Sequence, residues 1–363
     1  MKILITGNLG YVGPVLVKEL RKKYPDAILI GYDLGFFSKY LTTSGISPDS
    51  FLDIQYYGDV RNFPERYLQD VDTVVHLAAI SNDPIGNRFE DVTLDINYKA
   101  TLDIAKKAKS NGVKSFVFAS SCSVYGFAED GARTETSTVN PLTAYAKSKV
   151  LSEEGLSQIA DENFTVTCLR FATACGFSER LRLDLVLNDF VAGALTAGEI
   201  TILSDGTPWR PLINVKDMAR AIIWSHERTK NDGGSFLVVN AGSNQWNYQV
   251  KELARAIQEI LPETKVSINK DAQPDKRSYK VDFSLFNTLA PDYQPIYDLQ
   301  NTIHELILGL KSIDFKDQNF RTSNLIRLIV INELKAKSIV DSELRVVQSK
   351  AERLIGESEE VLS

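Results

Sequence analysis

Cysteine and histidine are scarce in this chain of 363 residues, which contains three of each. The three cysteines, Cys122, Cys168 and Cys175, have neither the spacing of metal ligands nor the even number typical of a disulfide framework. We therefore expect a reducing, cytoplasmic environment and no metal site.

Long apolar runs and an excess of positive charge are also lacking. No apolar run reaches the length of a membrane-spanning helix. Residues 1–5 already have the pattern of a buried strand, so we expect neither a signal peptide nor a transit peptide. The net charge of -6 argues against a nucleic-acid-binding surface and against a basic membrane-binding patch. We therefore expect no nucleic-acid partner and no membrane partner.

What the sequence does contain is an alternation of apolar and amphipathic segments. The predicted strands are residues 2–6, 27–32, 73–78, 115–119 and 165–170, and the predicted helices between them are residues 12–23, 91–109 and 145–159. Apolar strands joined by helical crossovers indicate a parallel sheet with both faces covered. The predicted fold class is therefore α/β, with a doubly wound parallel sheet of the Rossmann type.

A glycine-rich turn joins the first predicted strand to the first predicted helix. It reads Thr6-Gly7-Asn8-Leu9-Gly10-Tyr11-Val12-Gly13. Glycines allow a pyrophosphate to approach the backbone, and a helix N-terminus attracts phosphate. The spacing Gly-x-x-Gly-x-x-Gly differs from the dinucleotide fingerprint Gly-x-Gly-x-x-Gly, and a simple tight turn also explains it. The candidate cofactor-binding residues of this turn are Gly7, Gly10, Tyr11, Val12 and Gly13.

The end of the second predicted strand favours NAD as the cofactor. Asp33 lies about 20 residues beyond the glycines, where a carboxylate binds the adenosine ribose hydroxyls. No lysine or arginine follows it directly, and a carboxylate repels the 2′-phosphate of NADP. A solvated aspartate at a strand end is the alternative reading. Further candidates for cofactor contact follow the next two strands: Asp59, Val60, Leu77, Ala78 and Ala79.

Tyr145 and Lys149 are four residues apart and therefore share one face of a predicted helix. A lysine ammonium there lowers the pKa of the phenol toward working pH, as acid–base chemistry requires. Most such pairs are solvated helix faces, so this pair needs support from elsewhere. Ser121 gives that support, because it follows the predicted strand 115–119 and would face the same crevice.

Taken together, these motifs resemble the extended short-chain dehydrogenase/reductases, the NAD-dependent epimerase/dehydratase family that acts on nucleotide sugars. Their order and separations match the family over roughly residues 1–310. The matching segments are Thr6-Gly7-x-x-Gly10-x-x-Gly13, Asp33, Asp59-Val60, Leu77-Ala78-Ala79, Ser120-Ser121-x-x-Val124-Tyr125-Gly126 and Tyr145-x-x-x-Lys149.

The resemblance implies a role for each residue of the catalytic set. Ser121 would bind the sugar oxygen that is interconverted, and Tyr145 would be the general base or acid. Lys149 would lower the pKa of Tyr145 and hold the nicotinamide ribose. Asn97, on the helix after the fourth strand, would support the cofactor site, although an exposed helical asparagine is an equal alternative.

The second half of the chain resembles the substrate-binding part of the family. Thr173 stands where the family commonly has asparagine, which puts that substrate contact in doubt. The arginines among the candidates suit a nucleotide diphosphate, because guanidinium groups bind phosphate through paired hydrogen bonds, but surface ion pairs would also explain them. The candidate substrate-binding residues are Ser123, Thr173, Asn188, Arg210 and Arg277; the basic run at residues 180–183 is left without a role.

We expect four segments in the organisation of the chain. Residues 1–176 form the NAD-binding Rossmann domain, to which residues 211–243 return, with a helix predicted at 213–227 and a strand at 235–240. Residues 177–210 and 244–310, with a helix predicted at 248–261, form a smaller interleaved α/β substrate domain at the C-terminal side. Residues 311–363 form a helical C-terminal extension. The resemblance also implies a homodimer built on the helices at residues 91–109 and 145–159.

The residues beside Ser121 narrow the reaction. Sugar 4,6-dehydratases resemble one another in having Asp-Glu at this place, whereas this chain has Cys122-Ser123. Neither is a carboxyl acid or base, so 4,6-dehydration is disfavoured. The favoured function is an NAD-dependent nucleotide-sugar epimerase acting through a transient keto-sugar. The alternatives are an NAD(P)H-dependent keto-sugar reductase and, more remotely, a non-catalytic dinucleotide-binding protein.

Overall fold

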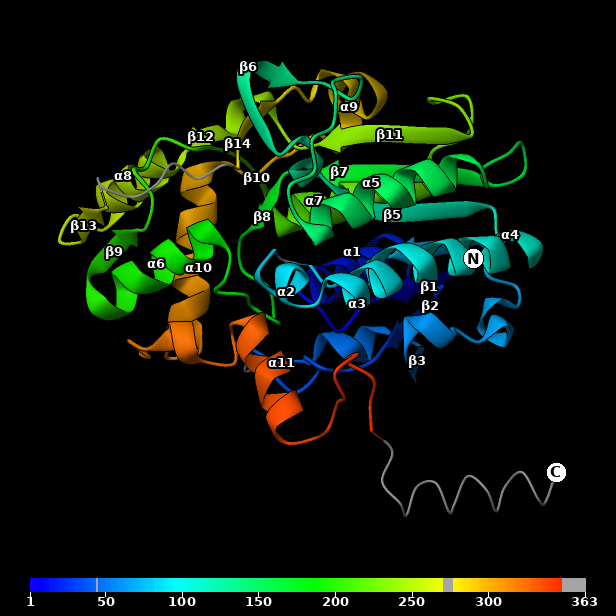
Figure 1. The fold of residues 1–363 in the computed structure, drawn as a ribbon, viewed down its shortest axis with the longest axis horizontal. Helices are drawn as coiled ribbons and strands as arrows, with labels where there is room; N and C mark the ends of the chain where they lie inside the picture. Colours follow the sequence, from blue (N-terminus) through cyan, green and yellow to red (C-terminus); the bar gives the residue numbers. More distant parts are fainter. Residues whose placement is uncertain (44, 82, 270–276, 348–363) are drawn as a thin grey trace.

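Seven strands form one parallel sheet in the spatial order β3-β2-β1-β4-β5-β7-β11 (Figure 1). The computed structural model describes residues 1–43, 45–81, 83–269 and 277–347. The strands of this sheet are β1 (Lys2–Thr6), β2 (Ile28–Asp33), β3 (Ile54–Tyr57), β4 (Thr73–His76), β5 (Ser115–Ser121), β7 (Thr165–Phe171) and β11 (Phe236–Ala241). The chain runs outward from β1 to β3 and then crosses back to β4, so the strand order reverses between β1 and β4. At such a reversal the carboxyl ends of the strands border a crevice.

Helices cover both faces of this sheet, as the alternating apolar residues require. Ile3 and Ile5 on β1 share a core with α1 (Gly13–Lys23) and α7 (Val215–Glu227). Leu4, between them, belongs to the opposite core, with α4 (Ala100–Ser110) and α5 (Ala144–Ser157). The predicted doubly wound α/β fold is confirmed.

The predicted helix at residues 91–109 is divided by a wider turn. It consists of α3 (Glu90–Leu94), a π-helical turn at Asp95–Lys99 and α4. Inside this turn the carbonyl oxygen of Asn97 accepts hydrogen bonds from Thr101 at 2.7 Å and from Ser152 of α5 at 2.9 Å. The π turn therefore fixes the contact between the two helices that cover this face of the sheet.

Smaller sheets and helices form the second part of the molecule, on the left of Figure 1. Strands of this part pair across distant stretches of sequence: β8 with β10, β9 with β13 and β6 with β14. The two parts are therefore interleaved. The strands outside the large sheet are β6 (Phe127–Arg133), β8 (Thr173–Cys175), β9 (Glu199–Ile202), β10 (Trp209–Asn214), β12 (Asn247–Gln249), β13 (Lys265–Ile268) and β14 (Ser278–Val281). The α-helices of the chain not yet named are α2 (Asp83–Arg88), α6 (Val186–Ala197), α8 (Val250–Ile260), α9 (Ser284–Leu289), α10 (Leu299–Ser312) and α11 (Arg327–Ala336). Short 3-10 turns occupy Pro48–Phe51, Val60–Asn62, Glu65–Leu68, Cys122–Tyr125, Asn244–Trp246, Pro291–Tyr293 and Phe320–Thr322.

Several predicted boundaries were wrong for local reasons. The helix expected from residue 213 begins at Val215, because Asn214 is still in β10 and its side chain accepts a hydrogen bond from the Lys216 N–H. The helix expected from residue 248 begins at Val250, after β12. The C-terminal extension is less helical than expected: within residues 313–347 its α-helix is α11, and residues 348–363 lie outside the described part of the chain. No helix in the described ranges combines the length and apolar character needed to cross a bilayer.

Candidate active site

A cavity of about 570 Å³ lies at the carboxyl edge of the large sheet, between the two parts of the molecule. Most of the predicted site residues line it, although they come from distant parts of the sequence. They are Gly7, Gly10, Tyr11, Val12, Asp33, Asp59, Val60, Leu77, Ala78, Ala79, Ser121, Ser123, Tyr145, Lys149, Thr173, Arg210 and Arg277. Gly13, Asn97 and Asn188 lie behind this wall rather than in it.

The glycine turn forms one wall of the cavity because side chains would not fit there. Gly7 has a φ of +75°, and a Cβ on it would lie 2.5 Å from the Ala78 nitrogen. A Cβ on Gly13 would lie 1.9 Å from the carbonyl oxygen of Asn8. The helix α1 starts after Val12 without a side-chain cap, which leaves its first N–H groups to bind phosphate oxygens. This wall fits the diphosphate of a dinucleotide.

Asp33, at the end of β2, is held in place by the backbone on both sides. Its Oδ2 accepts a hydrogen bond from the Leu9 N–H at 3.1 Å, and its Oδ1 accepts one from the Gly35 N–H at 2.7 Å. Burial raises the pKa of Asp33, although these two N–H groups oppose the rise. Each carboxylate oxygen has a second lone pair for a further donor. The residue therefore keeps acceptor capacity for a hydroxyl-bearing ligand in the cavity, and its binding of the adenosine ribose stays a prediction.

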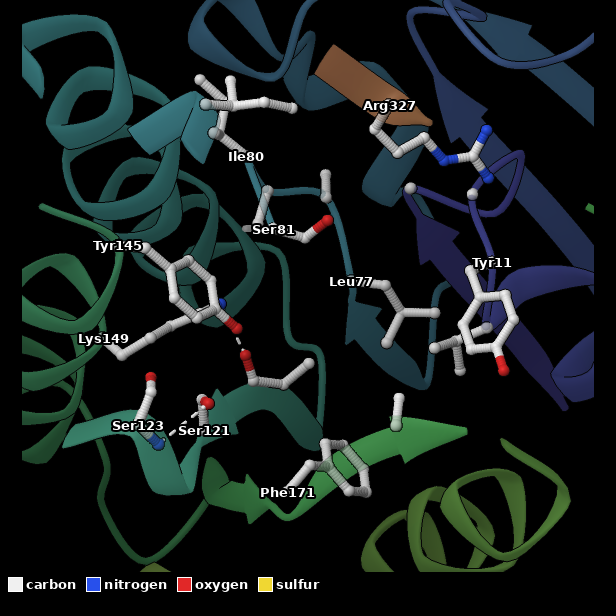
Figure 2. A pocket seen from close by; sticks show the side chains of 18 of the residues that line it. Tyr11, Leu77, Ile80, Ser81, Ser121, Ser123, Tyr145, Lys149, Phe171 and Arg327 are labelled. Atoms are coloured by element: carbon white, nitrogen blue, oxygen red, sulfur yellow. Dashed lines mark hydrogen bonds between the residues drawn. The ribbon is translucent and has the colours of Figure 1, made fainter. Parts of the chain in front are cut away.

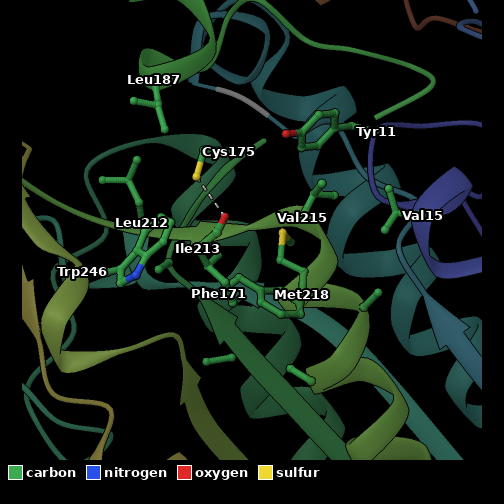
Figure 3. Packing of buried hydrophobic residues seen from close by; sticks show 14 of the residues in the cluster. Tyr11, Val15, Phe171, Cys175, Leu187, Leu212, Ile213, Val215, Met218 and Trp246 are labelled. Carbon is green, nitrogen blue, oxygen red and sulfur yellow. Dashed lines mark hydrogen bonds between the residues drawn. The ribbon is translucent and has the colours of Figure 1, made fainter. Parts of the chain in front are cut away.

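Tyr145 and Lys149 project from the first turns of α5 into the cavity (Figure 2). Thr143 caps this helix, its hydroxyl accepting a hydrogen bond from the Ala146 N–H at 3.2 Å. The Lys149 Nζ lies 5.5 Å from the centre of the Tyr145 ring and donates a hydrogen bond to the Ala119 carbonyl at 2.6 Å. Burial lowers the pKa of Lys149 to about 8, a shift that the nearby Glu153 opposes. The lysine therefore stays protonated at neutral pH.

The charged and titratable groups around Lys149 leave its own charge uncompensated at the Tyr145 end of the cavity. Glu153, one turn further along α5, is paired with Arg170 at 2.6 Å, and both side chains are buried. His76 lies on the other side, where burial, followed by the charge of Lys149, lowers its pKa to about 3. The histidine is therefore neutral and the charge of Glu153 is matched by Arg170.

Two serine hydroxyls lie opposite Tyr145, at the end of β5 (Figure 2). The Oγ of Ser121 accepts a hydrogen bond from the Ser123 N–H at 3.1 Å, which leaves its own hydrogen free to donate. The Oγ of Ser123 is buried and has no hydrogen-bond partner among the described residues. Both hydroxyls are therefore available to a ligand in the cavity.

Asn97 and Asn188 bind main-chain groups that border the cavity. The side-chain amide of Asn97 accepts a hydrogen bond from the Ile80 N–H at 2.8 Å and donates one to the Ile80 carbonyl at 2.9 Å. That of Asn188 accepts from the Gly176 N–H at 3.0 Å and donates to the Arg182 carbonyl at 2.9 Å. Asn97, expected to support the cofactor site, and Asn188, expected to bind substrate, both lie behind the residues that line the cavity.

Arg182 lines the cavity and was not among the predicted site residues. Its guanidinium pairs with Asp184 at 2.9 Å and donates a hydrogen bond to the Ser81 hydroxyl at 3.1 Å. Burial works to lower the pKa of Arg182, but Asp184, Tyr11 and Tyr145 together raise it. The basic run at residues 180–183 was visible in the sequence, but its spacing did not show which arginine faces the site.

The C-terminal extension also reaches the cavity, through Arg327, Ile331 and Leu344. Arg327 and Ile331 lie on α11, and Leu344 lies in the segment that follows it. No motif in the sequence connected this extension with the site, because the resemblance ended near residue 310.

Comparison with known proteins gives a consistent result. The sequence model described as "NAD dependent epimerase/dehydratase family" matches residues 3–242. The chain is 29% identical to "Uncharacterized UDP-glucose epimerase YtcB" of Bacillus subtilis, over 61% of this chain and 71% of that protein. It is 25% identical to "UDP-glucuronic acid decarboxylase 6" of Arabidopsis thaliana, over 78% of this chain and 81% of that protein.

A solved structure of a protein with a nucleotide-sugar function has a similar fold. The structure of TunA, described as an NAD-dependent NDP-hexosamine 5,6-dehydratase of tunicamycin biosynthesis, has a TM-score of 0.75 and 26% identity. The likeness covers 87% of this chain and 99% of that one. The names of these proteins describe different reactions on nucleotide sugars, so the likeness identifies a class of chemistry and not a single reaction.

Proposed function

Since the chain belongs to the NAD dependent epimerase/dehydratase family, we propose that it is a nucleotide-sugar epimerase. Membership of this family makes the chain an NAD-dependent enzyme that modifies nucleotide sugars. The predicted cofactor and the predicted enzyme class are therefore confirmed. The reaction, the roles of the individual residues, the homodimer and the cytoplasmic location remain proposals.

Different residues of the cavity would bind the cofactor and the substrate. NAD, when bound, supplies a hydride acceptor that can also return the hydride. Gly7, Gly10 and Asp33 would hold its adenosine and diphosphate part. Arg210 and Arg277, on the substrate side of the cavity, would bind the diphosphate of the nucleotide sugar.

Proton transfer would be the work of Tyr145. Its phenol oxygen takes the proton of the sugar hydroxyl as the carbon is oxidised and gives it back when the carbon is reduced. The protonated Lys149 stabilises the negative charge that develops on the phenol. Ser121, opposite Tyr145, donates its free hydrogen to the same sugar oxygen. Together these three side chains would carry the sugar to a keto form and back.

The single observation that favours epimerisation is the absence of a carboxyl group at residues 122 and 123, directly after Ser121. Cys122 is completely buried, its thiol donates to the Arg170 carbonyl, and burial raises its pKa far above neutral. Ser123 has no acidity of use near neutral pH. Position 122–123 therefore offers no acid or base for 4,6-elimination of water, whereas epimerisation needs only Ser121, Tyr145 and Lys149. A keto-sugar reductase would use the same three residues and is the second candidate.

The reaction is tested by incubating the purified protein with UDP-glucose, UDP-N-acetylglucosamine or UDP-glucuronic acid, without added cofactor, and following the sugar by NMR. We expect one of these sugars to reach an equilibrium between two epimers, with NAD retained on the protein as seen by mass spectrometry. Turnover only with added NAD(P)H and a keto-sugar would instead support the reductase. Loss of carbon dioxide or of water would contradict both.

The role of Tyr145 is tested by Tyr145→Phe in the same assay. Because general acid–base catalysis contributes about 10²- to 10⁴-fold, we expect turnover to fall by at least that factor. The NAD content of the purified variant should stay close to that of the wild type. Near-normal turnover in this variant would show that Tyr145 is not the acid–base group.

A further inference from the structure

The C-terminal segment at residues 313–347, here called the cap, forms part of the cavity wall. Its apolar residues Val330, Ile331, Leu334, Val340 and Leu344 are buried in one small core. That core also contains Ile80, Ile85 and Phe89, and Phe36 and Phe37 pack against it. The cap therefore packs directly against the segments that follow β2 and β4. In Figure 1 its helix α11 lies at the lower edge of the molecule, below α2.

The far end of the cap is attached to the cofactor side of the cavity. Arg61 is paired with Asp59, one of the residues that line the cavity. The same guanidinium donates a hydrogen bond to the Glu343 carbonyl at 2.7 Å. Helix α11 and residues 343–344 of the cap thus both reach the wall where the sequence predicted the adenosine half of the dinucleotide.

Arg327, the first residue of α11, has an unused hydrogen-bond donor in this wall. Its side chain is 3% exposed and lies over the Phe37 ring, 4.1 Å from the ring centre. Its Nη2 donates to the Arg180 carbonyl at 3.1 Å, while its Nη1 is buried with no partner among the described residues. Figure 2 shows the side chain extending from α11 toward the side of the cavity where Tyr11 lies.

Arg327 also forms no ion pair with a described residue, although Asp184 and Asp33 act on its charge from further away. Arg180 is paired with Asp49 and Arg182 with Asp184, whereas no carboxylate of the described chain lies within ion-pair distance of Arg327. Burial, and then the charge of Arg182, lower the pKa of Arg327 to about 9, although the more distant carboxylates Asp184 and Asp33 oppose this shift. A buried cation with a free donor is costly unless an anion binds it. An anionic group bound in the cavity would supply the partner that Nη1 lacks.

We propose that Arg327 donates a hydrogen bond to the phosphate-bearing part of NAD and that the cap retains the cofactor. The proposal adds a binding residue from outside the segments that carry the resemblance. It rests on the cofactor, not on the proposed epimerisation. An epimerase benefits from such retention, because it oxidises and reduces the sugar on one NAD molecule.

The test compares Arg327→Met with Arg321→Met in protein from which the cofactor has been removed. Methionine keeps an apolar stem that can pack against Phe37. Arg321 is a matched control in the same cap: it lies over the Phe320 ring, but its guanidinium pairs with Asp189 and is 48% exposed. Binding of NAD is measured by titration calorimetry without substrate, and its release by displacement kinetics.

We expect Arg327→Met to bind NAD about tenfold to a hundredfold more weakly, as for the loss of one hydrogen bond to a charged group. Arg321→Met should bind within twofold of the wild type. Arg327→Lys, which keeps the charge but not the fork of donors, should fall between them. Thermal unfolding of the cofactor-free variants checks that each one folds.

Three results would overturn the proposal. The first is unchanged NAD affinity in Arg327→Met, and the second is an equal loss in Arg321→Met. The third is a loss confined to NADP⁺ or to UDP, which would assign Arg327 to a 2′-phosphate or to the substrate. Because no substrate is present, these results do not depend on which reaction the enzyme catalyses.

Discussion

The buried charge of Lys149 suits acid–base chemistry but lowers the free energy of unfolding. The residue is 3% exposed, and burial lowers the pKa of its ammonium from 10.5 to about 8. Below pH 8 the buried charge lowers the free energy of unfolding. Between pH 8 and pH 10.5 the folded protein loses this proton while the unfolded chain keeps it, so the free energy of unfolding rises with pH over this range. This buried lysine therefore destabilises the folded state at neutral pH.

We accordingly expect Lys149→Met to unfold less readily than the wild type at pH 7. The expected gain is about 1–2 kcal/mol, because the lost hydrogen bond to Ala119 offsets part of the relief. Urea unfolding of the cofactor-free proteins at pH 7 and pH 9.5 measures it, and the gain should shrink at the higher pH. Lys147→Met is the control, since Lys147 is exposed on the same helix. A less stable Lys149→Met at pH 7 would contradict the argument.

For single residues, the sequence predicted a place in the cavity where the partner is near in the chain or the residue belongs to a motif. Tyr145 and Lys149 meet because four residues make about one helical turn. Arg182 and Arg327 meet the cavity only through the tertiary fold, which brings residues 182 and 327 to the same wall. Nothing in their local sequence distinguishes them from surface arginines, so they could not be predicted.

At the scale of the element, the glycine turn combines two separate requirements. Gly13 is needed by the protein itself, since a Cβ there would lie 1.9 Å from a main-chain oxygen. Gly10 is different, because a Cβ there would meet only the Gly7 oxygen, at 3.2 Å, while Gly10 lines the cavity. One glycine therefore serves packing and the other serves the ligand.

Alanine at each position should separate these two requirements. Gly13→Ala should lower the unfolding free energy of the cofactor-free protein by about 2–3 kcal/mol, as expected for overpacking against the backbone. Gly10→Ala should unfold within about 1 kcal/mol of the wild type yet bind NAD at least tenfold more weakly. Urea unfolding and calorimetric titration give the two quantities. Equal stability of the two variants would refute the distinction.

The order of the elements was predictable, and their ends were less so. Strands such as 115–119 are continuous apolar runs, which makes their existence clear from sequence. Their ends depend on caps and pairing: Asn214 ends β10 and caps α7 at once. The π turn at Asp95–Lys99 depends on Ser152, which lies on another helix. Such contacts are long-range, so no local pattern shows them.

At the scale of the whole molecule, the interleaving of the two parts explains why the chain has no visible hinge. Strand β11 and helix α7 complete the large sheet and its cover, although segments of the second part precede and follow them in sequence. The cap then closes one wall of the cavity against the segments that follow β2 and β4. The end of β10 pairs with β8 and β12 in a small sheet, whereas α7 and β11 belong to the large sheet and its cover, so the expected return of residues 211–243 to the first domain stays a prediction.

The predicted homodimer can be tested on the outer face of α3, the π turn and α5. Leu94, Tyr98 and Leu151 are partly exposed there and belong to none of the buried cores. We expect the wild type to sediment as a dimer at micromolar concentration and Leu151→Arg to sediment as a monomer, because an unpaired charge inside an apolar interface is costly. Lys22→Glu, an exposed change on α1 at the opposite face of the sheet, should leave the dimer intact. A monomeric wild type would refute the dimer, and a dimeric Leu151→Arg would place its interface elsewhere.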